Sequence, residues 1–334
     1  MLLDLRSDPF GERSAWPATK RMQLLGANVR FDSNGSELMD LVDWAYKDLP
    51  RHRLSRIACE LRVGLLLKTD ARPSARAEPP PFSMLAGSGL LGGATDRSNF
   101  VVMSPREHAA LVVVSPQMLR FPYHTRYELI EFAVFTLAAR AQRLVPLHAA
   151  CIGQGGRGIL LIGPSGSGKS TVALHCLLDG FDFLSEDSAF VSPDTMLATG
   201  ISNFVHIRAD SLRWLGRSRE ATLIRKSPVI RRRSGVKKFE VDLRRDDFRL
   251  AKSPLKIVGA VFLSPESARN RPLLKPVSKS ALLAHFEDTQ AYAASQPQWR
   301  EFRRNVSRLD AFELRRGRHP LEAVKVLRSL LAIQ

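Results

Sequence analysis

The chain has few cysteines, few aromatic residues and no long apolar run, and each shortage argues against a class of protein. Its three cysteines, Cys59, Cys151 and Cys176, lie far apart without a Cys-x-x-Cys pair. This argues against a disulfide framework or a cysteine zinc site, and we expect reduced, part-buried thiols. No apolar run approaches the roughly 20 residues that a membrane-spanning helix needs. Acidic residues near the N-terminus are unlike a secretory signal, so we expect a cytoplasmic protein without a membrane partner.

Positive charge, in contrast, is plentiful and unevenly placed. The formal net charge is +17, and residues 212–256 hold 15 basic residues against 5 acidic ones. Such a segment suits phosphate groups, nucleic acid or an acidic protein, and it also suits a plain solvated surface. Aromatic residues make up only 7% of the chain. Residues 225–238 in particular are poor in aromatic side chains on which bases could stack, which weakens the case for single-stranded nucleic acid.

Hydrophobic periodicity indicates two parts, an N-terminal α+β lobe over residues 1–145 and an α/β domain over residues 146–334. In the lobe we expect a loosely structured leader at 1–25, loops at 72–81 and 83–98, and an amphipathic helix at 126–143. Its expected strands are 28–31, 61–67, 100–103 and 110–114. In the domain we expect helices at 169–178, 278–285 and 320–331. The strands expected there are 147–152, 158–162, 181–184, 189–191, 205–207, 239–241 and 257–263.

The most specific motif is a P-loop. Residues 163–170 match G-x-x-x-x-G-K-[ST], between an apolar strand and an amphipathic helix. Glycines let backbone N–H groups converge on phosphate oxygens, and the helix dipole adds to their field. The motif predicts ATP and Mg²⁺, with Lys169 on the phosphates and Ser170 on the metal. The expected nucleotide-binding residues are Gly163, Pro164, Ser165, Gly166, Ser167, Gly168, Lys169, Ser170 and Thr171.

A second glycine-rich segment, residues 153–158, also matches a nucleotide-binding pattern, G-x-G-x-x-G. A dinucleotide site requires a helix after this pattern, whereas an apolar strand follows here. We interpret the segment as a hairpin turn.

Two adjacent carboxylates, Glu186 and Asp187, follow the strand expected at 181–184. Neighbouring residues on an extended chain point to opposite sides, so one can face a metal while the other accepts a hydroxyl proton. A solvated acidic pair is the alternative interpretation. His148 falls on the strand expected at 147–152, where a histidine is more often a core residue than a catalyst.

These segments together resemble a known family. The run Leu147-His148-Ala149-Ala150, the P-loop segment 158–171 and the segment 179–187 resemble the catalytic domain of HPr kinase/phosphorylase. They resemble more closely the HPr-kinase-related proteins that include the lasso-peptide precursor kinases. The resemblance covers about residues 147–208 and implies an α/β P-loop fold of the phosphoenolpyruvate-carboxykinase type. It also implies phosphorylation of a serine on a peptide or protein.

The same resemblance implies roles for individual residues. Glu186 takes the position of the general base, Asp187 assists the metal beside Ser170, and His148 is the active-site histidine. Two departures from the family pattern stand out. Glu186 is one methylene longer than the family's aspartate, and His206 replaces a glutamate of HPr kinase proper. These departures argue against phosphorylase activity.

The basic segment 225–238 is expected to be a mobile loop that enters a strand. Under the kinase hypothesis, Lys237, Lys238 and Arg208 are candidate contacts to the transferred phosphoryl group. A solvated loop is the alternative for the arginine triplet within it.

The leading hypothesis is therefore an ATP-dependent kinase that acts on a hydroxyl, with the N-terminal lobe presenting the acceptor or a partner. A small-molecule kinase on the same scaffold is one alternative. A nucleotide-binding regulatory module without turnover is another, favoured by Glu186 and His206 at catalytic positions. A nucleic-acid-binding NTPase depends on the charge alone. The sequence leaves the presence of a homo-oligomer open.

Overall fold

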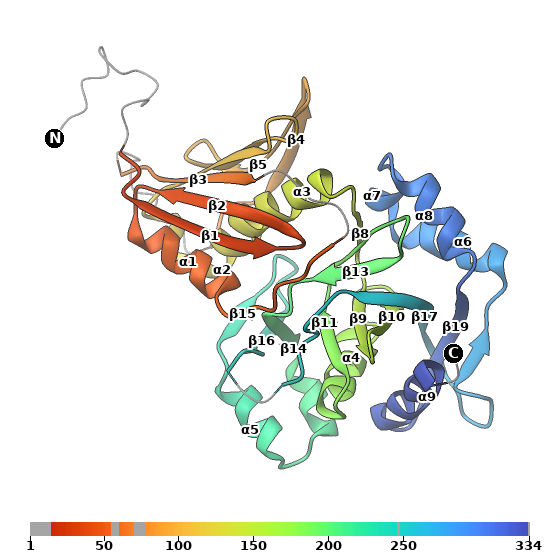
Figure 1. The fold of residues 1–334 in the computed structure, drawn as a ribbon. Coiled ribbons are helices and arrows are strands. Elements are labelled where there is room, and N and C mark those ends of the chain that lie inside the picture. The colour runs from red at the N-terminus through yellow and green to blue at the C-terminus, as the bar shows by residue number, and fades with distance from the viewer. Residues whose placement is uncertain (1–14, 55–59, 70–77, 246–247, 333–334) are drawn as a thin grey trace. The chain divides into compact units, whose positions relative to one another are not determined.

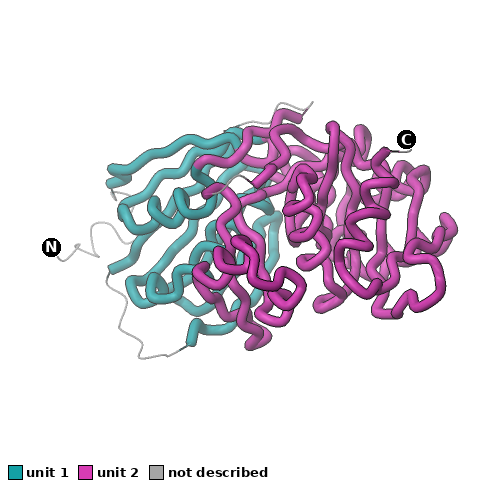
Figure 2. The backbone as a smooth tube through the Cα atoms, turned by 90° about the horizontal axis from the view of Figure 1, so that it is seen from below, with its two compact units in different colours: residues 1–23, 27–47, 58–137 teal, residues 24–26, 48–57, 138–334 magenta. Residues whose placement is uncertain are grey.

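The computed structural model describes residues 15–54, 60–69, 78–245 and 248–332. The chain divides into two compact units that are coloured separately in Figure 2. Unit 1 comprises residues 1–23, 27–47 and 58–137, and unit 2 comprises residues 24–26, 48–57 and 138–334. No helix within the described ranges is both long enough and apolar enough to cross a membrane.

Unit 1 is built on a seven-stranded sheet with the order β1-β2-β3-β7-β6-β5-β4 (Figure 1). Strand β3 pairs in parallel with β2 and β7, and β4 to β7 form an antiparallel meander. The elements are β1 (Ala18–Leu24), β2 (Ala27–Ser33), α1 (Ser36–Tyr46), β3 (Leu61–Leu67), β4 (Ser83–Gly87), β5 (Leu90–Asp96), β6 (Asn99–Ser104), β7 (Ala109–Val114), η1 (Met118–Arg120), α2 (Pro122–His124), η2 (Thr125–Glu131) and α3 (Phe132–Ala141).

Two expectations for this region are wrong. The segment 83–98, expected to be a loop, forms the hairpin of β4 and β5. Its glycines and serines hide the strand pattern, and Ser88 and Gly89 form the turn with positive φ. Part of the expected leader is strand β1, while residues 1–14 of that leader and residues 72–77 of the other expected loop lie outside the described residues. The helix expected at 126–143 is present, and its first part, η2, is a π-helix.

Unit 2 is built on a nine-stranded mixed sheet whose main path is β11-β9-β10-β17-β13-β12-β8. Strand β17 continues the sheet through β19, which also pairs with β18. The elements are β8 (Val145–Leu147), β9 (Ala150–Gln154), β10 (Arg157–Ile162), α4 (Lys169–Leu178), β11 (Asp182–Ser185), β12 (Ala189–Val191), β13 (Leu197–Gly200), β17 (Leu255–Ser267), β18 (Leu274–Pro276), α6 (Lys279–Thr289), α7 (Ala291–Ala294), α8 (Trp299–Val306), β19 (Asp310–Arg316) and α9 (Pro320–Ala332).

Strand β10 is buried on both faces, which explains its continuous apolar sequence. Ile159 and Leu161 pack into a core that includes residues of α4 and α9. Leu160 and Ile162 point to the opposite face and pack into a core that includes residues of α6 and α8. The sheet thus holds β10, from whose end the next loop leaves, between two helical layers.

A smaller antiparallel sheet, β14-β16-β15, is the third sheet of the described chain. Its strands are β14 (Phe204–Ile207), β15 (Val229–Arg231) and β16 (Lys237–Asp242), accompanied by the 3-10 helix η3 (Ala209–Trp214) and by α5 (Arg219–Lys226). The expectation of a mobile loop at 225–238 is wrong, because most of this segment is the end of α5 and the β15–β16 hairpin. Two backbone hydrogen bonds close that hairpin, Arg232 N to Val236 O at 2.9 Å and Gly235 N to Arg232 O at 2.8 Å.

The strand expected at 147–152 is divided in two. Strand β8 pairs with β12, whereas β9 pairs with β10 and β11, so the chain changes neighbours between Leu147 and Ala150. His148 lies in this crossing and in neither strand, which corrects its expected placement. The hairpin expected at 153–158 is confirmed, with Gly155 and Gly156 at φ of 59° and 79° forming its two-residue turn.

Cys151 and Cys176 are buried free thiols, as expected. Burial raises the pKa of both thiols, so they are held in the neutral form. Cys59 lies outside the described residues.

Candidate phosphate-binding and catalytic site

The P-loop connects the end of β10 at Ile162 to the start of α4 at Lys169. Gly166 and Gly168 have φ of 83° and 105°, a region that residues with a Cβ rarely adopt. At Gly163 a Cβ would lie 2.7 Å from Ser167 Oγ and 3.3 Å from Leu263 O, so a larger residue there would displace the Ser167 side chain. The expected glycine roles are thus backbone requirements of the loop.

The N-terminus of α4 is suited to an anion. Its N-cap residue is Gly168, which has no side chain to accept hydrogen bonds from the first-turn N–H groups. Ser167 Oγ is buried and, within the described part of the chain, has no hydrogen-bond partner. Both features fit the phosphates of a nucleotide, which would accept hydrogen bonds from these groups.

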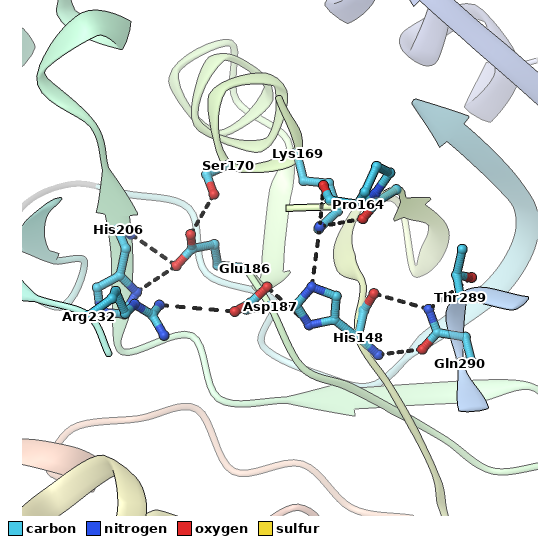
Figure 3. Close-up of polar contacts among 11 residues, drawn as sticks. His148, Pro164, Lys169, Ser170, Glu186, Asp187, His206, Arg232, Thr289 and Gln290 are labelled. Carbon is cyan, nitrogen blue, oxygen red and sulfur yellow. Dashed lines mark hydrogen bonds and ion pairs between the residues drawn. The ribbon is translucent and has the colours of Figure 1, made fainter. Parts of the chain in front are cut away.

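Lys169 is buried, and its ammonium donates to Gly163 O at 2.6 Å. Burial lowers the pKa of Lys169, while the carboxylates of Asp187 and Glu186 act against that shift. The ammonium therefore lies inside the loop, and the charges of both carboxylates act on it. Figure 3 shows Lys169 together with Glu186 and Asp187.

The two carboxylates that follow β11 point in different directions, as expected for adjacent residues of an extended chain. Glu186 turns toward α4 and accepts the Ser170 hydroxyl at 2.6 Å. Its other oxygen lies 2.9 Å from the backbone N and 2.7 Å from Nδ1 of His206. Glu186 therefore joins the P-loop hydroxyl to strand β14.

His206 lies between two buried carboxylates, since its Nε2 is 3.1 Å from Oε1 of Glu240 on β16. Carboxylates only accept hydrogen bonds, so both ring nitrogens donate and the ring is an imidazolium. Burial by itself lowers the pKa of His206, but the charge and hydrogen bond of Glu186, together with the hydrogen bond to Glu240, outweigh it and raise the pKa. For Glu186 the effects have the opposite signs. Burial alone raises the pKa of this carboxyl, but the charge of His206 outweighs burial, and the pKa is lowered overall.

Asp187 turns the other way, toward His148 (Figure 3). Its Oδ1 lies 3.4 Å from His148 Nδ1, and Arg232 lies 4.0 Å from Oδ2. The second ring nitrogen of His148, Nε2, is 3.3 Å from Lys169 Nζ. The side chains of His148 and Asp187 are 52% and 31% exposed, so this pair is open to an incoming molecule, unlike Glu186.

The structure brings together five of the side chains that the sequence singles out: Lys169, Ser170, Glu186, Asp187 and His148. Others lie apart from them. The Thr171 hydroxyl contacts Ser211 of η3 at 3.0 Å. Arg208 pairs with Asp210 at 3.3 Å on the surface.

Among the basic candidates, Lys238 is close enough for its charge to act on both Lys169 and Glu186. Lys237, the neighbouring residue, is exposed. Neither Lys237 nor Arg208 has a hydrogen bond or ion pair with the P-loop in the described ranges.

A magnesium ion needs little from the protein, because it keeps most of its water ligands and shares the nucleotide phosphates. The described residues contain no group of three or more His, Cys, Asp or Glu side chains arranged to hold a metal. The Ser170 hydroxyl with the Glu186 carboxylate at 2.6 Å is the oxygen donor set that fits.

Sequence reasoning missed three residues of this neighbourhood, Glu240, Arg232 and Gln290, and it also missed the pairing of His206 with Glu186. Glu240 and Arg232 belong to a strand pairing that no local pattern reveals. Gln290 bonds to the backbone of His148 from 142 residues away. The only available signal was His206 itself, since a histidine beside an altered carboxylate suggests a compensating pair.

Comparison with known proteins adds little to this geometry. No protein-family model and no curated protein matches the chain. One similar solved structure is the Hpr(Ser) kinase/phosphatase from Coxiella burnetii, which shares 10% sequence identity. The match covers 55% of this chain and 88% of that chain, with a TM-score of 0.28. A likeness of this size carries no argument about fold or activity, so the geometry of the site must carry the function.

Proposed function

We propose that the protein is an ATP-dependent phosphotransferase that moves the γ-phosphoryl group to a hydroxyl. One observation carries this proposal: two separate side-chain pairs, Ser170 with Glu186 and His148 with Asp187, lie around the P-loop lysine. His148 contacts Lys169 at 3.3 Å, and the charges of both carboxylates act on it. A P-loop that only holds a nucleotide needs the first pair. The second pair, which is exposed, is the part that a transfer reaction needs.

For the nucleotide, we assign the phosphates to the loop N–H groups, to Ser167 and to Lys169. The Ser170 hydroxyl and the Glu186 carboxylate, 2.6 Å apart, are the oxygen donors that would hold a magnesium ion. A bound magnesium ion would neutralise negative charge that develops on the transferred phosphoryl group. His206 bonds to Glu186 and is itself bonded to Glu240, so the two residues hold the Glu186 carboxylate in place.

For the transfer, we assign Asp187 as the general base, with His148 holding its carboxylate through Nδ1. The acceptor oxygen forms a bond to the γ-phosphorus while the bond between that phosphorus and the β–γ bridging oxygen breaks. The hydroxyl proton passes to Asp187, and ADP leaves. These roles are the reverse of those implied by the family resemblance, because here Glu186 contacts the P-loop hydroxyl and Asp187 is the exposed carboxylate.

For the acceptor, we propose a serine of a peptide or protein. The support is the resemblance of residues 147–208 to HPr-kinase-related proteins and the excess of basic residues near the site. A phosphoenolpyruvate-carboxykinase-like fold is part of the same proposal.

Transfer from γ-labelled Mg·ATP to a library of serine-containing peptides, with small hydroxyl compounds in parallel, tests the proposal. We expect labelled peptide with the wild-type chain and none with Lys169→Met. Lys256→Met is the matched control, because the Lys256 ammonium donates to Thr195 O at 2.6 Å, outside the P-loop. Label only on small compounds would overturn the peptide assignment. ATP binding without ADP formation under any condition would overturn the enzyme assignment and favour a regulatory module.

A further inference from the structure

His148 occupies a backbone position that the sheet itself leaves unsupported. It lies between β8 and β9, and a hydrogen bond from Ala149 N to Leu147 O at 3.0 Å makes it the centre of a three-residue turn. The N–H and C=O of His148 therefore take no part in either strand pairing. An unpaired backbone amide in a part-buried place is costly, so something must hold both groups.

The side-chain amide of Gln290 holds both. His148 N–H donates to Gln290 Oε1 at 2.7 Å, and Gln290 Nε2 donates to His148 O at 3.3 Å (Figure 3). The orientation of the amide follows from chemistry, because the N–H can only donate and the carbonyl can only accept. Gln290 thus pairs with His148 as a neighbouring strand would, at a point where no strand is present.

Gln290 is itself rigidly held. It is 4% exposed and joins α6 to α7. Its backbone N–H donates to Phe286 O at 2.9 Å, and its backbone carbonyl accepts from Ala294 N at 2.8 Å. Phe286 and Ala293 on either side belong to the same apolar core as Leu147 and Ala149. The helical layer and the turn around His148 are therefore parts of one packed unit.

The two hydrogen bonds from Gln290 to the His148 backbone determine where the His148 ring lies. With its backbone fixed on both sides, His148 places Nδ1 3.4 Å from Asp187 and Nε2 3.3 Å from Lys169. The ring is half-exposed, so packing around it restrains it little. A shift of the backbone by about an ångström would separate it from Asp187, and misplacement on this scale can cost about 100-fold in rate.

We propose that Gln290 is a positioning residue for His148, a role that rests on the proposed phosphotransferase function. Among the described residues it makes no hydrogen bond to the P-loop or to Glu186 and Asp187. It acts by fixing the turn from which the histidine reaches Asp187.

The test compares Gln290→Leu and Gln290→Glu with Gln298→Leu in the full chain. Gln298 is the matched control. It is 7% exposed and stands at the N-cap position of α8 without a side-chain capping bond, and its Oε1 has no partner in the described part of the chain. For Gln290→Leu we expect kcat for transfer from γ-labelled Mg·ATP to fall about 10- to 100-fold, with Kd for Mg·ATP unchanged within about twofold. Gln290→Glu keeps the acceptor for His148 N–H and should lie between Gln290→Leu and wild type.

Two readouts distinguish positioning from general support. In a His148→Ala background, Gln290→Leu should cause no further loss of kcat, since it acts through the missing ring. Hydrogen exchange of the His148 amide should accelerate in Gln290→Leu and stay at the wild-type rate in Gln298→Leu. Equal losses of kcat for Gln290→Leu and Gln298→Leu, or additive losses with His148→Ala, would overturn the inference.

Failure of the proposed function gives a different pattern. If wild-type protein transfers no phosphoryl group, or if His148→Ala transfers normally, the assigned chemistry is wrong whatever Gln290 does. The role of Gln290 in fixing the His148 backbone is then tested by hydrogen exchange of the His148 amide alone. An unchanged exchange rate in Gln290→Leu would contradict that role as well.

Discussion

At the scale of single residues, the least usual arrangement is the buried row of Glu186, His206 and Glu240. Two carboxylates and one imidazolium lie within hydrogen-bond distance, and none of the three residues is more than 7% exposed. Buried charges are tolerated when they are paired, and removing one partner leaves the other uncompensated. His206 is the shared partner of both acids, so it is the member whose loss is most costly.

We expect His206→Leu to lower the free energy of unfolding by about 3–5 kcal/mol at neutral pH, measured by chemical denaturation. His175→Leu is the control. His175 is also buried, but its Nε2 has no hydrogen-bond partner in the described ranges. Burial, aided by His319, lowers the pKa of His175 to about 4, so the ring is neutral at pH 7. That substitution should cost less than about 1.5 kcal/mol. Similar losses for both variants would contradict the account of the row.

The limits of sequence reasoning are clearest at Glu186 and Asp187. Their adjacency after an apolar strand predicts that they point to opposite sides, and they do. Which of them faces the Ser170 hydroxyl depends on β14 and on the turn around His148. Those elements approach β11 from distant parts of the chain, so no local pattern contains the answer.

At the scale of elements, the small sheet β14-β16-β15 contributes one face to the site. His206 on β14 pairs directly with Glu240 on β16, and Lys238 lies two residues before Glu240 on the same face. Lys237 is on the opposite face and is exposed. The sequence offered both lysines as phosphate contacts, and the alternation of the strand separates them.

We expect Lys238→Met to weaken Mg·ATP binding about 3- to 10-fold, because a positive charge near Lys169 and Glu186 is lost. Lys237→Met is the control, and its Kd should match that of the wild type. Isothermal titration of both variants gives the comparison. A larger effect for Lys237→Met than for Lys238→Met would contradict the assigned face.

The elements that could be predicted are those with strong periodicity and ordinary composition, such as β3, β10 and α4. The elements missed include β4, which is exposed along its length and ends in Gly87, and β19, which carries four charged residues among its seven. Strand β19 is stabilised by parallel pairing with β17 rather than by its own pattern. Pairing of this kind joins distant segments and leaves no trace in a local window.

At the scale of the whole molecule, the two units are interleaved along the chain. The segment of residues 48–57 belongs to unit 2, although unit 1 supplies the chain on both sides of it. His52 anchors this segment, with Nδ1 2.8 Å from Thr199 Oγ1 and Nε2 2.9 Å from Ala251 O. A carbonyl only accepts, so Nε2 carries the proton and Nδ1 accepts from the threonine.

We expect His52→Leu to lower the free energy of unfolding by about 1–3 kcal/mol above pH 7, because a buried hydroxyl and a buried carbonyl lose their partner. Burial lowers the pKa of His52 despite the bond to Ala251 O. The unfolded chain therefore takes up the proton first as the pH falls below about 6.5, and the contribution of His52 shrinks. Denaturation at pH 7.5 and pH 5 measures both effects. A penalty that grows toward pH 5 would contradict the neutral, buried ring.

The central claim is that the two adjacent carboxylates do different work, and paired variants test it most directly. Transfer from γ-labelled Mg·ATP is measured for Asp187→Asn and Glu186→Gln over a range of magnesium concentrations. We predict that Asp187→Asn loses at least about 100-fold in kcat with an unchanged magnesium dependence. Glu186→Gln should require more magnesium for half-maximal rate. A normal kcat for Asp187→Asn, or the same magnesium dependence in both variants, would contradict the account.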